Sequence, residues 1–148
     1  MKKSLLFVCY GLGIGGIEKC LVNLINALPE ARYDVDLLVM NPEYAMMPQI
    51  RRNVTFLDAF RYTLNTEFTM QEIRKRGGIL RHLDLLLPYI DHRVRIKLGL
   101  PVWTKFRPLE KEYDIAVAYS QNGISLNYVI DKVTAKRKVL WYHNGAYE

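Results

Sequence analysis

A glycine-rich loop near the start of the chain has the residue types and spacing that bind anionic groups. The stretch 10–19 carries four glycines and lies between an apolar run over residues 4–10 and a helical pattern over residues 17–28. A glycine loop between a strand and a helix brings backbone N–H groups and the positive end of the helix dipole to one point. This arrangement suits a phosphate. The candidate phosphate-contacting residues are Gly13, Gly15 and Gly16.

Two other interpretations of these glycines stay open. The spacing over residues 11–16, Gly-x-Gly-x-x-Gly, matches a dinucleotide-binding fingerprint, which expects an acidic residue at the end of the second strand. The predicted second strand, residues 35–40, ends before Pro42, and Glu43 follows that proline, so the expected acid is missing. Glycines at this spacing are also typical of a tight turn that has positive φ angles and binds no ligand.

Glu18 lies in the first turn of the predicted helix, where a carboxylate complements the helix dipole. A carboxylate this close to a bound phosphate would repel it. We therefore expect the Glu18 side chain to face sideways, toward an uncharged ligand or another loop.

Polar side chains follow two later apolar runs. Ser120 and Gln121 come directly after one run, and His143 and Asn144 come after the last one. Ligands bind at the carboxyl ends of the strands in an open parallel sheet, so we expect these loops to converge with the glycine loop. A single histidine at such a position is structural as often as catalytic, and both roles are open for His143. No His or Cys cluster has the spacing of metal ligands, so no metal site is predicted.

The apolar runs and helical patterns predict one α/β domain over residues 1–148. Strands are expected at residues 4–10, 35–40, 54–57, 114–119 and 138–142, and helices at 17–28 and 124–130. Strands that alternate with helices at this spacing favour right-handed crossovers and a mostly parallel sheet. Residues 59–108 have a different pattern, which we interpret as a helical insertion at the edge of the sheet.

The insertion is rich in basic residues that are interleaved with leucine and isoleucine. Its basic side chains include Arg74, Lys75, Arg76, Arg93, Arg95 and Lys97. Such a run is usually a solvated helix face, but together with the apolar positions it also suits contact with an anionic membrane. His82 and His92 lie among these charges, and we expect both at the surface. Gly99, with Pro101 beyond it, is expected to end the last helix of the insertion.

The composition indicates a globular chain that favours anionic partners. Half of the 148 residues are hydrophobic, 24% are charged, and the formal net charge is +6. That charge favours a phosphorylated ligand, an acidic lipid or nucleic acid, and nucleic acid is disfavoured because no recognition motif accompanies the charge. No apolar run is long enough to suggest a membrane span. Cys9 falls on a strand and Cys20 on the apolar stripe of the first helix, which predicts two buried thiols in a reducing, cytoplasmic setting.

Three stretches of the chain together resemble the N-terminal domain of a family 4 glycosyltransferase with the GT-B fold. Residues 7–19 are similar to that family's first strand, Gly-Gly-x-Glu loop and first helix, and residues 113–119 are the second stretch. Residues 138–144 resemble the strand that ends in Trp-x-His in many bacterial members that build surface polysaccharides. The resemblance covers both ends of the chain well and the insertion poorly. It implies a Rossmann-like three-layer sandwich.

The resemblance also implies a retaining transfer of a sugar from a nucleotide-sugar donor, a UDP- or GDP-sugar, to an acceptor hydroxyl, without a cofactor. Gly15 and Gly16 would approach the donor phosphates, and His143, as the catalytic residue, would hydrogen-bond a hydroxyl of the transferred sugar. The acceptor, often a glycan on a lipid carrier, would lie mainly on this domain, peripheral to the inner face of the membrane. The implied acceptor or sugar contacts are Glu18, Ser120, Gln121 and Asn144.

Two departures from the family pattern shape this expectation. Family members have a second Rossmann-like domain with most nucleotide-sugar contacts and a pair of glutamates, whereas this chain ends at Glu148. The chain is therefore expected to be the acceptor-side half of the enzyme and to be inactive alone. Asn144 is followed by Gly145, where relatives often carry an acid. The alternative functions are an NAD(P)-type dinucleotide-binding module and a non-enzymatic membrane-docking domain.

Overall fold

The fold is described by a computed structural model for residues 1–41, 43–63, 82–120 and 122–143. Within these ranges the strands are β1 (Lys3–Cys9), β2 (Tyr33–Val39), β3 (Thr55–Leu57), β4 (Tyr113–Ala118) and β5 (Ala135–Leu140). The α-helices there are α1 (Gly16–Ala27), α2 (Ala59–Tyr62), α4 (His82–Lys97) and α5 (Gly123–Lys132). The same ranges hold the short 3-10 helices η1 (Met47–Gln49) and η3 (Trp103–Lys105).

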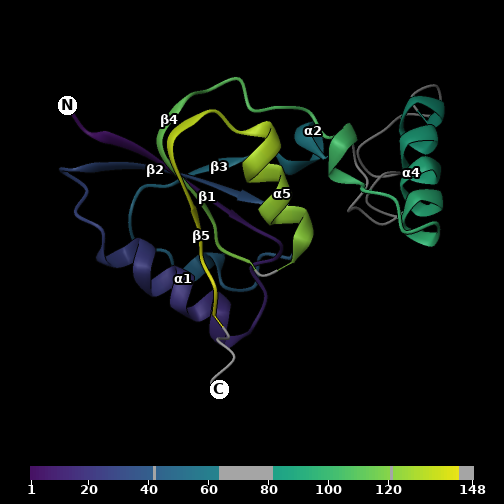
Figure 1. The fold of residues 1–148 in the computed structure, drawn as a ribbon. Helices are drawn as coiled ribbons and strands as arrows, with labels where there is room; N and C mark the ends of the chain where they lie inside the picture. The colour runs from purple at the N-terminus through teal and green to yellow at the C-terminus, as the bar shows by residue number, and fades with distance from the viewer. Residues whose placement is uncertain (42, 64–81, 121, 144–148) are drawn as a thin grey trace, which may run out of the picture.

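The strands form one parallel sheet in the order β3-β2-β1-β4-β5 (Figure 1). β2 and β4 pair with opposite edges of β1, so the strand order reverses between β1 and β4. α1 packs on one face of the sheet and α5 on the other, which gives three layers. The predicted α/β, Rossmann-like sandwich is confirmed. In sheets of this type, ligands bind in the crevice outside the carboxyl ends of the strands at the reversal.

The central strands are apolar on both faces because both faces are covered. On one face, Leu21 of α1 lies in a cluster with Phe7 of β1. On the other face, Tyr128 of α5 lies in a second cluster with Leu6. Parallel strands that are buried on both faces have continuous apolar sequences, and this is why β1 and β4 could be recognised in the sequence.

The buried side of α1 corrects one prediction for this helix. Its buried residues include Leu21 and Val22, whereas Cys20 is exposed rather than buried. Successive residues of an α-helix are about 100° apart, so a buried side that is turned toward Val22 leaves Cys20 beyond its edge. Cys9, on β1, is buried as predicted.

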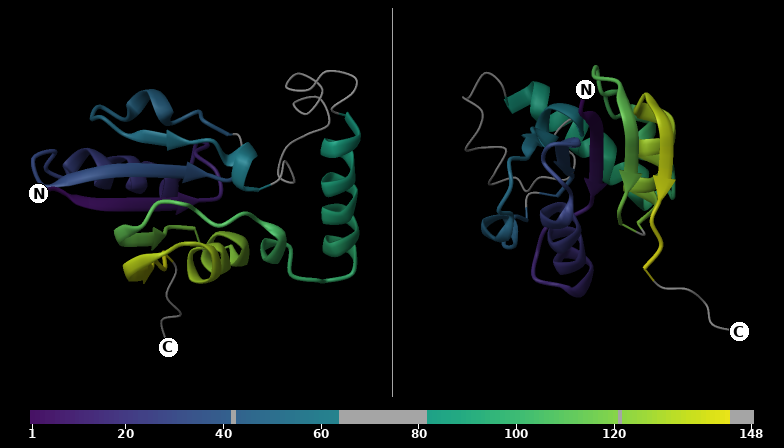
Figure 2. Two further views of the ribbon diagram at one scale, coloured as in Figure 1. Left: turned by 90° about the horizontal axis from the view of Figure 1, so that it is seen from above. Right: turned by 90° about the vertical axis from the view of Figure 1, so that its left-hand side faces the viewer.

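The insertion contributes α2, α4 and η3, and α4 stands apart from the sheet in the views of Figure 1 and Figure 2. α4 continues for 16 residues, and Gly99 follows it with a φ of 67°, the left-handed backbone that favours glycine. The predicted helix end at Gly99 is therefore confirmed. No helix in the described ranges is long and apolar enough to cross a membrane. The predicted basic helix, with Arg74, Lys75 and Arg76, lies outside the described residues.

Two further predictions are wrong. His92 is only 4% exposed, because it lies on the side of α4 that faces the domain. β5 begins at Ala135 and ends at Leu140, so Trp141 and Tyr142 belong to the loop that follows. Leu140 pairs with the last residue of β4, and the ladder between the two strands ends there.

Candidate functional site

Three loops meet at the carboxyl ends of β1, β4 and β5. The Tyr10 N–H donates to Ser120 Oγ over 2.7 Å, which joins the glycine loop to the loop after β4. The Trp141 N–H donates to Ala118 O over 2.9 Å, which joins the loop after β5 to the end of β4. The loops therefore converge as the sequence predicts, and Ser120 takes part in that convergence.

Tyr119 is the centre of an aromatic cluster in these loops. Its ring centroid lies 4.6 Å from that of His143 and 5.3 Å from that of Trp141. Phe7 of β1 makes an edge contact with Tyr119 at a centroid distance of 6.1 Å. Burial, together with the neighbouring Cys20, raises the pKa of the Tyr119 hydroxyl to about 12. Tyr119 was not predicted as a site residue, because in the sequence it ends an apolar run like any buried strand residue.

The backbone orients His143. Its Nε2 lies 2.9 Å from the carbonyl oxygen of Tyr119. A carbonyl oxygen only accepts hydrogen bonds, so Nε2 carries a proton and donates it to this oxygen. The imidazole is thus held at the carboxyl end of a strand by a backbone carbonyl group.

The glycines of the loop make room for two carboxylates. Among the described residues only Gly99 is a glycine with positive φ, and Gly15, the N-cap of α1, is extended. A Cβ placed on Gly13 would collide with the carboxylate of Glu43, and one placed on Gly15 would collide with that of Glu18. The interpretation as a tight turn with positive φ angles is therefore wrong. Glu18 folds back over the start of its own helix, and anionic oxygen atoms occupy the space beside both glycines.

Glu43 reaches the glycine loop because the segment after β2 pairs with it. The Leu12 N–H donates to Glu43 O over 2.8 Å, and the Met46 N–H donates to Leu12 O over 2.9 Å. β2 is the neighbour of β1, so residues just past the end of β2 lie beside the loop that follows β1. From the sequence, Glu43 was discounted because it follows Pro42. The signal that places it beside the loop is the strand order, in which β2 is next to β1.

The N-cap residue of α1, unlike that of α5, makes no side-chain hydrogen bond to the first turn of its helix. Asn122 caps α5, because its Oδ1 accepts from the Ser125 N–H over 2.9 Å and from Ser125 Oγ over 2.7 Å. Gly15 caps α1 without a side-chain hydrogen bond. The first-turn amides and the positive dipole of α1 therefore face the glycine loop. The Glu18 carboxylate compensates that positive potential.

Several of the predicted contact residues are not part of this loop cluster. Arg93, Arg95 and Lys97 lie on α4, which stands apart from the sheet (Figure 1). Gln121 and Asn144 lie outside the described residues. The loop cluster therefore consists of the glycine loop with Glu18 and Glu43, the Tyr119–Ser120 pair, and His143 with Trp141.

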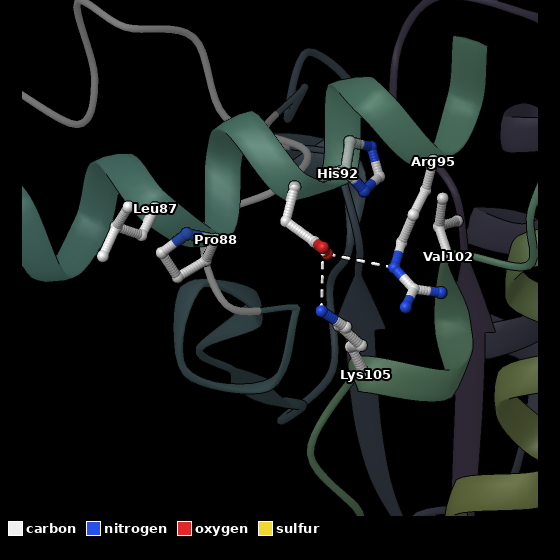
Figure 3. Close-up of a pocket in the computed structure, with 7 residues that line it drawn as sticks. Leu87, Pro88, His92, Arg95, Val102 and Lys105 are labelled. Atoms are coloured by element: carbon white, nitrogen blue, oxygen red, sulfur yellow. Dashed lines mark hydrogen bonds and ion pairs between the residues drawn. The ribbon is translucent and has the colours of Figure 1, made fainter. Parts of the chain in front are cut away.

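A separate pocket of about 330 Å³ lies between α4 and η3 (Figure 3). The carboxylate of Asp91 is 3.0 Å from Arg95 Nε and 2.8 Å from Lys105 Nζ. The hydrogen bond from Lys105 contributes most to holding the pKa of Asp91 below its ordinary value. The apolar part of the lining is Leu87, Pro88 and Val102. The pocket shares no lining residue with the loop cluster, so it is not part of the candidate site.

Comparisons of this chain with protein-family models, with curated proteins and with solved structures found no match. In the part of the chain that the structure describes, no group of three His, Cys, Asp or Glu side chains is placed to hold a metal ion. The fold and the geometry of the loop cluster are therefore the observations that bear on function.

Proposed function

We propose that this chain is the acceptor-side half of a retaining glycosyltransferase that uses a nucleotide-sugar donor in the synthesis of a surface polysaccharide or glycolipid. The observation that carries the proposal is the meeting of the glycine loop with Ser120 and His143 at the carboxyl ends of β1, β4 and β5. This position in a parallel sheet is where nucleotide-containing ligands bind. The resemblance of residues 7–19 and 138–144 to family 4 glycosyltransferases supports the same assignment.

Each part of the loop cluster has one task in this proposal. The first-turn amides of α1 and residues 13–16 hold the donor phosphates. His143 hydrogen-bonds a hydroxyl of the transferred sugar, while the Tyr119 carbonyl oxygen, which accepts from Nε2, orients the ring. Ser120 and Glu18 contact the acceptor or the sugar. A second domain, which the resemblance implies, supplies most of the nucleotide contacts.

Replacing His143 tests its role in the protein that includes the second domain. We expect His143→Ala to lower the turnover of sugar transfer about 100-fold, the scale for a positioned hydrogen-bonding group, with little change in melting temperature. Turnover is measured as release of UDP or GDP from the nucleotide-sugar. The matched control is Tyr142→Ala, which removes an exposed ring from the same loop. Unchanged turnover in His143→Ala would contradict the assigned role.

The 148-residue chain by itself tests ligand binding separately from turnover. Addition of UDP or GDP is expected to shift the backbone amide NMR signals of the glycine loop and of Ser120, and to leave those of α4 unchanged. The absence of such shifts at millimolar nucleotide would show that the loop does not hold the donor phosphates.

A dinucleotide-binding module is the second candidate, because Glu43 lies beside the glycine loop. In that class of site, an acid at the end of the second strand binds the ribose hydroxyls. Titration of the chain with NAD(H) and NADP(H) separates the two functions. Micromolar binding that Glu43→Ala abolishes would favour the dinucleotide. Binding of UDP without binding of either dinucleotide would favour the glycosyltransferase.

A further inference from the structure

One side of α4 is both apolar and exposed. Leu87, Ile90, Val94 and Leu98 recur at offsets of three and four, which places them on one side of the helix. These four residues, the α4 stripe, are between 48% and 66% exposed. Leu98 follows the last helical residue and continues the turn, since its N–H donates to Val94 O over 2.9 Å. The stripe is therefore one continuous apolar surface.

The opposite side of α4 faces the domain. His92 is buried there, and Tyr89 packs against the core cluster that includes α5. Figure 2 shows α4 standing apart from the sheet, and the α4 stripe is exposed whereas His92 is buried. Apolar side chains gathered on an outward surface indicate an interaction site rather than scattered exposure.

Basic side chains flank the α4 stripe. Arg93 is exposed, and it lies over the ring of Tyr89 at 5.2 Å and donates to the Tyr89 hydroxyl over 3.3 Å. Lys97 is exposed one turn further along the same flank. On the other flank, Arg95 pairs with Asp91 at 3.0 Å, which balances its charge. Among the described residues that flank the stripe, Arg93 and Lys97 therefore supply the unbalanced positive charge.

We propose that the α4 stripe docks on an anionic membrane surface, with its apolar side chains in the interface and with Arg93 and Lys97 on lipid phosphates. A helix with an apolar side and basic flanks lies in the plane of such a surface, and anionic lipids attract each basic residue close to them. The net charge of +6 acts in the same direction. A second copy of this chain is the poorer occupant, because two stripes packed together would bring Arg93 and Lys97 of both copies close to each other.

Co-sedimentation of the 148-residue chain with vesicles tests the proposal. We expect binding to vesicles that contain phosphatidylglycerol, little binding to pure phosphatidylcholine, and weaker binding as salt is added. The stripe variant is expected to lower the partition coefficient at least about tenfold, because it removes apolar side chains from the interface. The stripe variant is Leu87→Gln/Val94→Gln/Leu98→Gln. The matched control, with exposed apolar residues of α5 and β5 replaced, should bind like the wild type. This control is Ile130→Gln/Val139→Gln/Leu140→Gln.

A charge variant tests the basic flank and keeps the proposal open to refutation even if the stripe variant fails to fold by circular dichroism. Arg93→Gln/Lys97→Gln is expected to lower the partition coefficient on anionic vesicles about 30-fold, since two basic residues leave the charged surface. The matched control is Arg32→Gln/Arg51→Gln, which removes the same charge from exposed positions outside α4. This control should bind more tightly than the charge variant.

Four results would overturn the proposal. Two are seen with the wild type: equal binding to neutral and anionic vesicles, or no binding to either. The third is binding that neither the stripe variant nor the charge variant weakens. The fourth is a wild-type dimer, detected by light scattering, that the stripe variant abolishes. The last result would make a second copy the occupant. None of these measurements involves sugar transfer, so the membrane proposal and the glycosyltransferase proposal fail independently.

Discussion

Two carboxylates govern what the glycine loop can bind. Glu43 occupies the space beside Gly13, and Glu18 occupies the space beside Gly15. Both carboxylates are at the ends of flexible side chains, so a ligand can displace them without moving the backbone. Their charge opposes a phosphate in the same space, although it suits a hydroxyl-rich group. A phosphate would therefore enter the loop only if the nearer carboxylate turned aside.

Neutralising Glu43 should tighten the binding of a nucleoside diphosphate. One charge removed from beside a phosphate at a solvent-accessible position is worth about 1 kcal/mol, so we expect Glu43→Gln to raise the affinity for UDP about fivefold in isothermal titration calorimetry. The control is Glu30→Gln, which removes an exposed acid beyond the end of α1. A lower affinity in Glu43→Gln would instead indicate that the carboxylate accepts hydrogen bonds from the ligand.

Among the elements, β2 and β4 are joined by a buried carboxylate although they are not neighbours. Asp36 of β2 is 4% exposed, and it accepts from the Tyr113 hydroxyl over 2.8 Å and from Lys111 Nζ over 2.9 Å. Burial, reinforced by the hydrogen bond to Asp36, raises the pKa of the Tyr113 hydroxyl far above its ordinary value. The contact passes across β1, which lies between the two strands. It therefore fixes the strands on either side of the reversal in the sheet.

Removing that hydroxyl should destabilise the domain. Tyr113→Phe leaves a buried carboxylate without one of its two partners, so we expect the free energy of unfolding to fall by about 1–3 kcal/mol. Urea unfolding followed by circular dichroism measures the change. Tyr142→Phe removes a hydroxyl from an exposed ring and should have no measurable effect. Equal stability of Tyr113→Phe and the wild type would show that Lys111 alone satisfies Asp36.

The burial of His92 on α4 makes stability depend on pH. Burial lowers the pKa of His92 below its ordinary value of 6.5, and the positive charge of Arg93 lowers it further. The negative charge of Asp91 acts in the opposite direction but is the smallest of the three effects. The unfolded chain then binds a proton first as the pH falls, so the stabilisation by neutral His92 is complete above about pH 6.5 and is lost below it. We expect the free energy of unfolding to fall from neutral to mildly acidic pH, and His92→Gln to reduce that fall. The same pH dependence in both proteins would contradict this account.

At the scale of the whole molecule, the strands that are covered on both faces were predictable from the sequence. β1 and β4 were found because their apolar runs need no knowledge of their neighbours. The start of β5 was not found, because Lys136 and Arg137 are exposed at the edge of the sheet and carry no apolar signal. Edge strands often carry such charged residues. The first and last residues of β5 are therefore set by its pairing with β4 and not by the composition of β5.

The candidate site was predictable only where chain order alone brings residues together. Ser120 and His143 follow strands, so the parallel sheet carries them to the same edge. The positions of three other residues depend on how elements are placed relative to one another. The position of Glu43 depends on β2 being next to β1. The exposure of Cys20 depends on the rotation of α1, and the burial of His92 depends on which side of α4 faces the domain. Local sequence does not specify these relations.

The exposure of Cys20 equips the protein with an attachment point for an optical reporter. The chain has two cysteines, and burial, with the neighbouring Glu18, raises the pKa of Cys9 to about 12, which keeps its thiol protonated and unreactive. A maleimide dye therefore attaches at Cys20 alone, without an engineered residue. Cys20 lies near the start of α1 and close enough to Tyr119 to influence the pKa of that residue. Dye emission would then follow a ligand entering the loop cluster in real time, with the wild-type sequence unchanged.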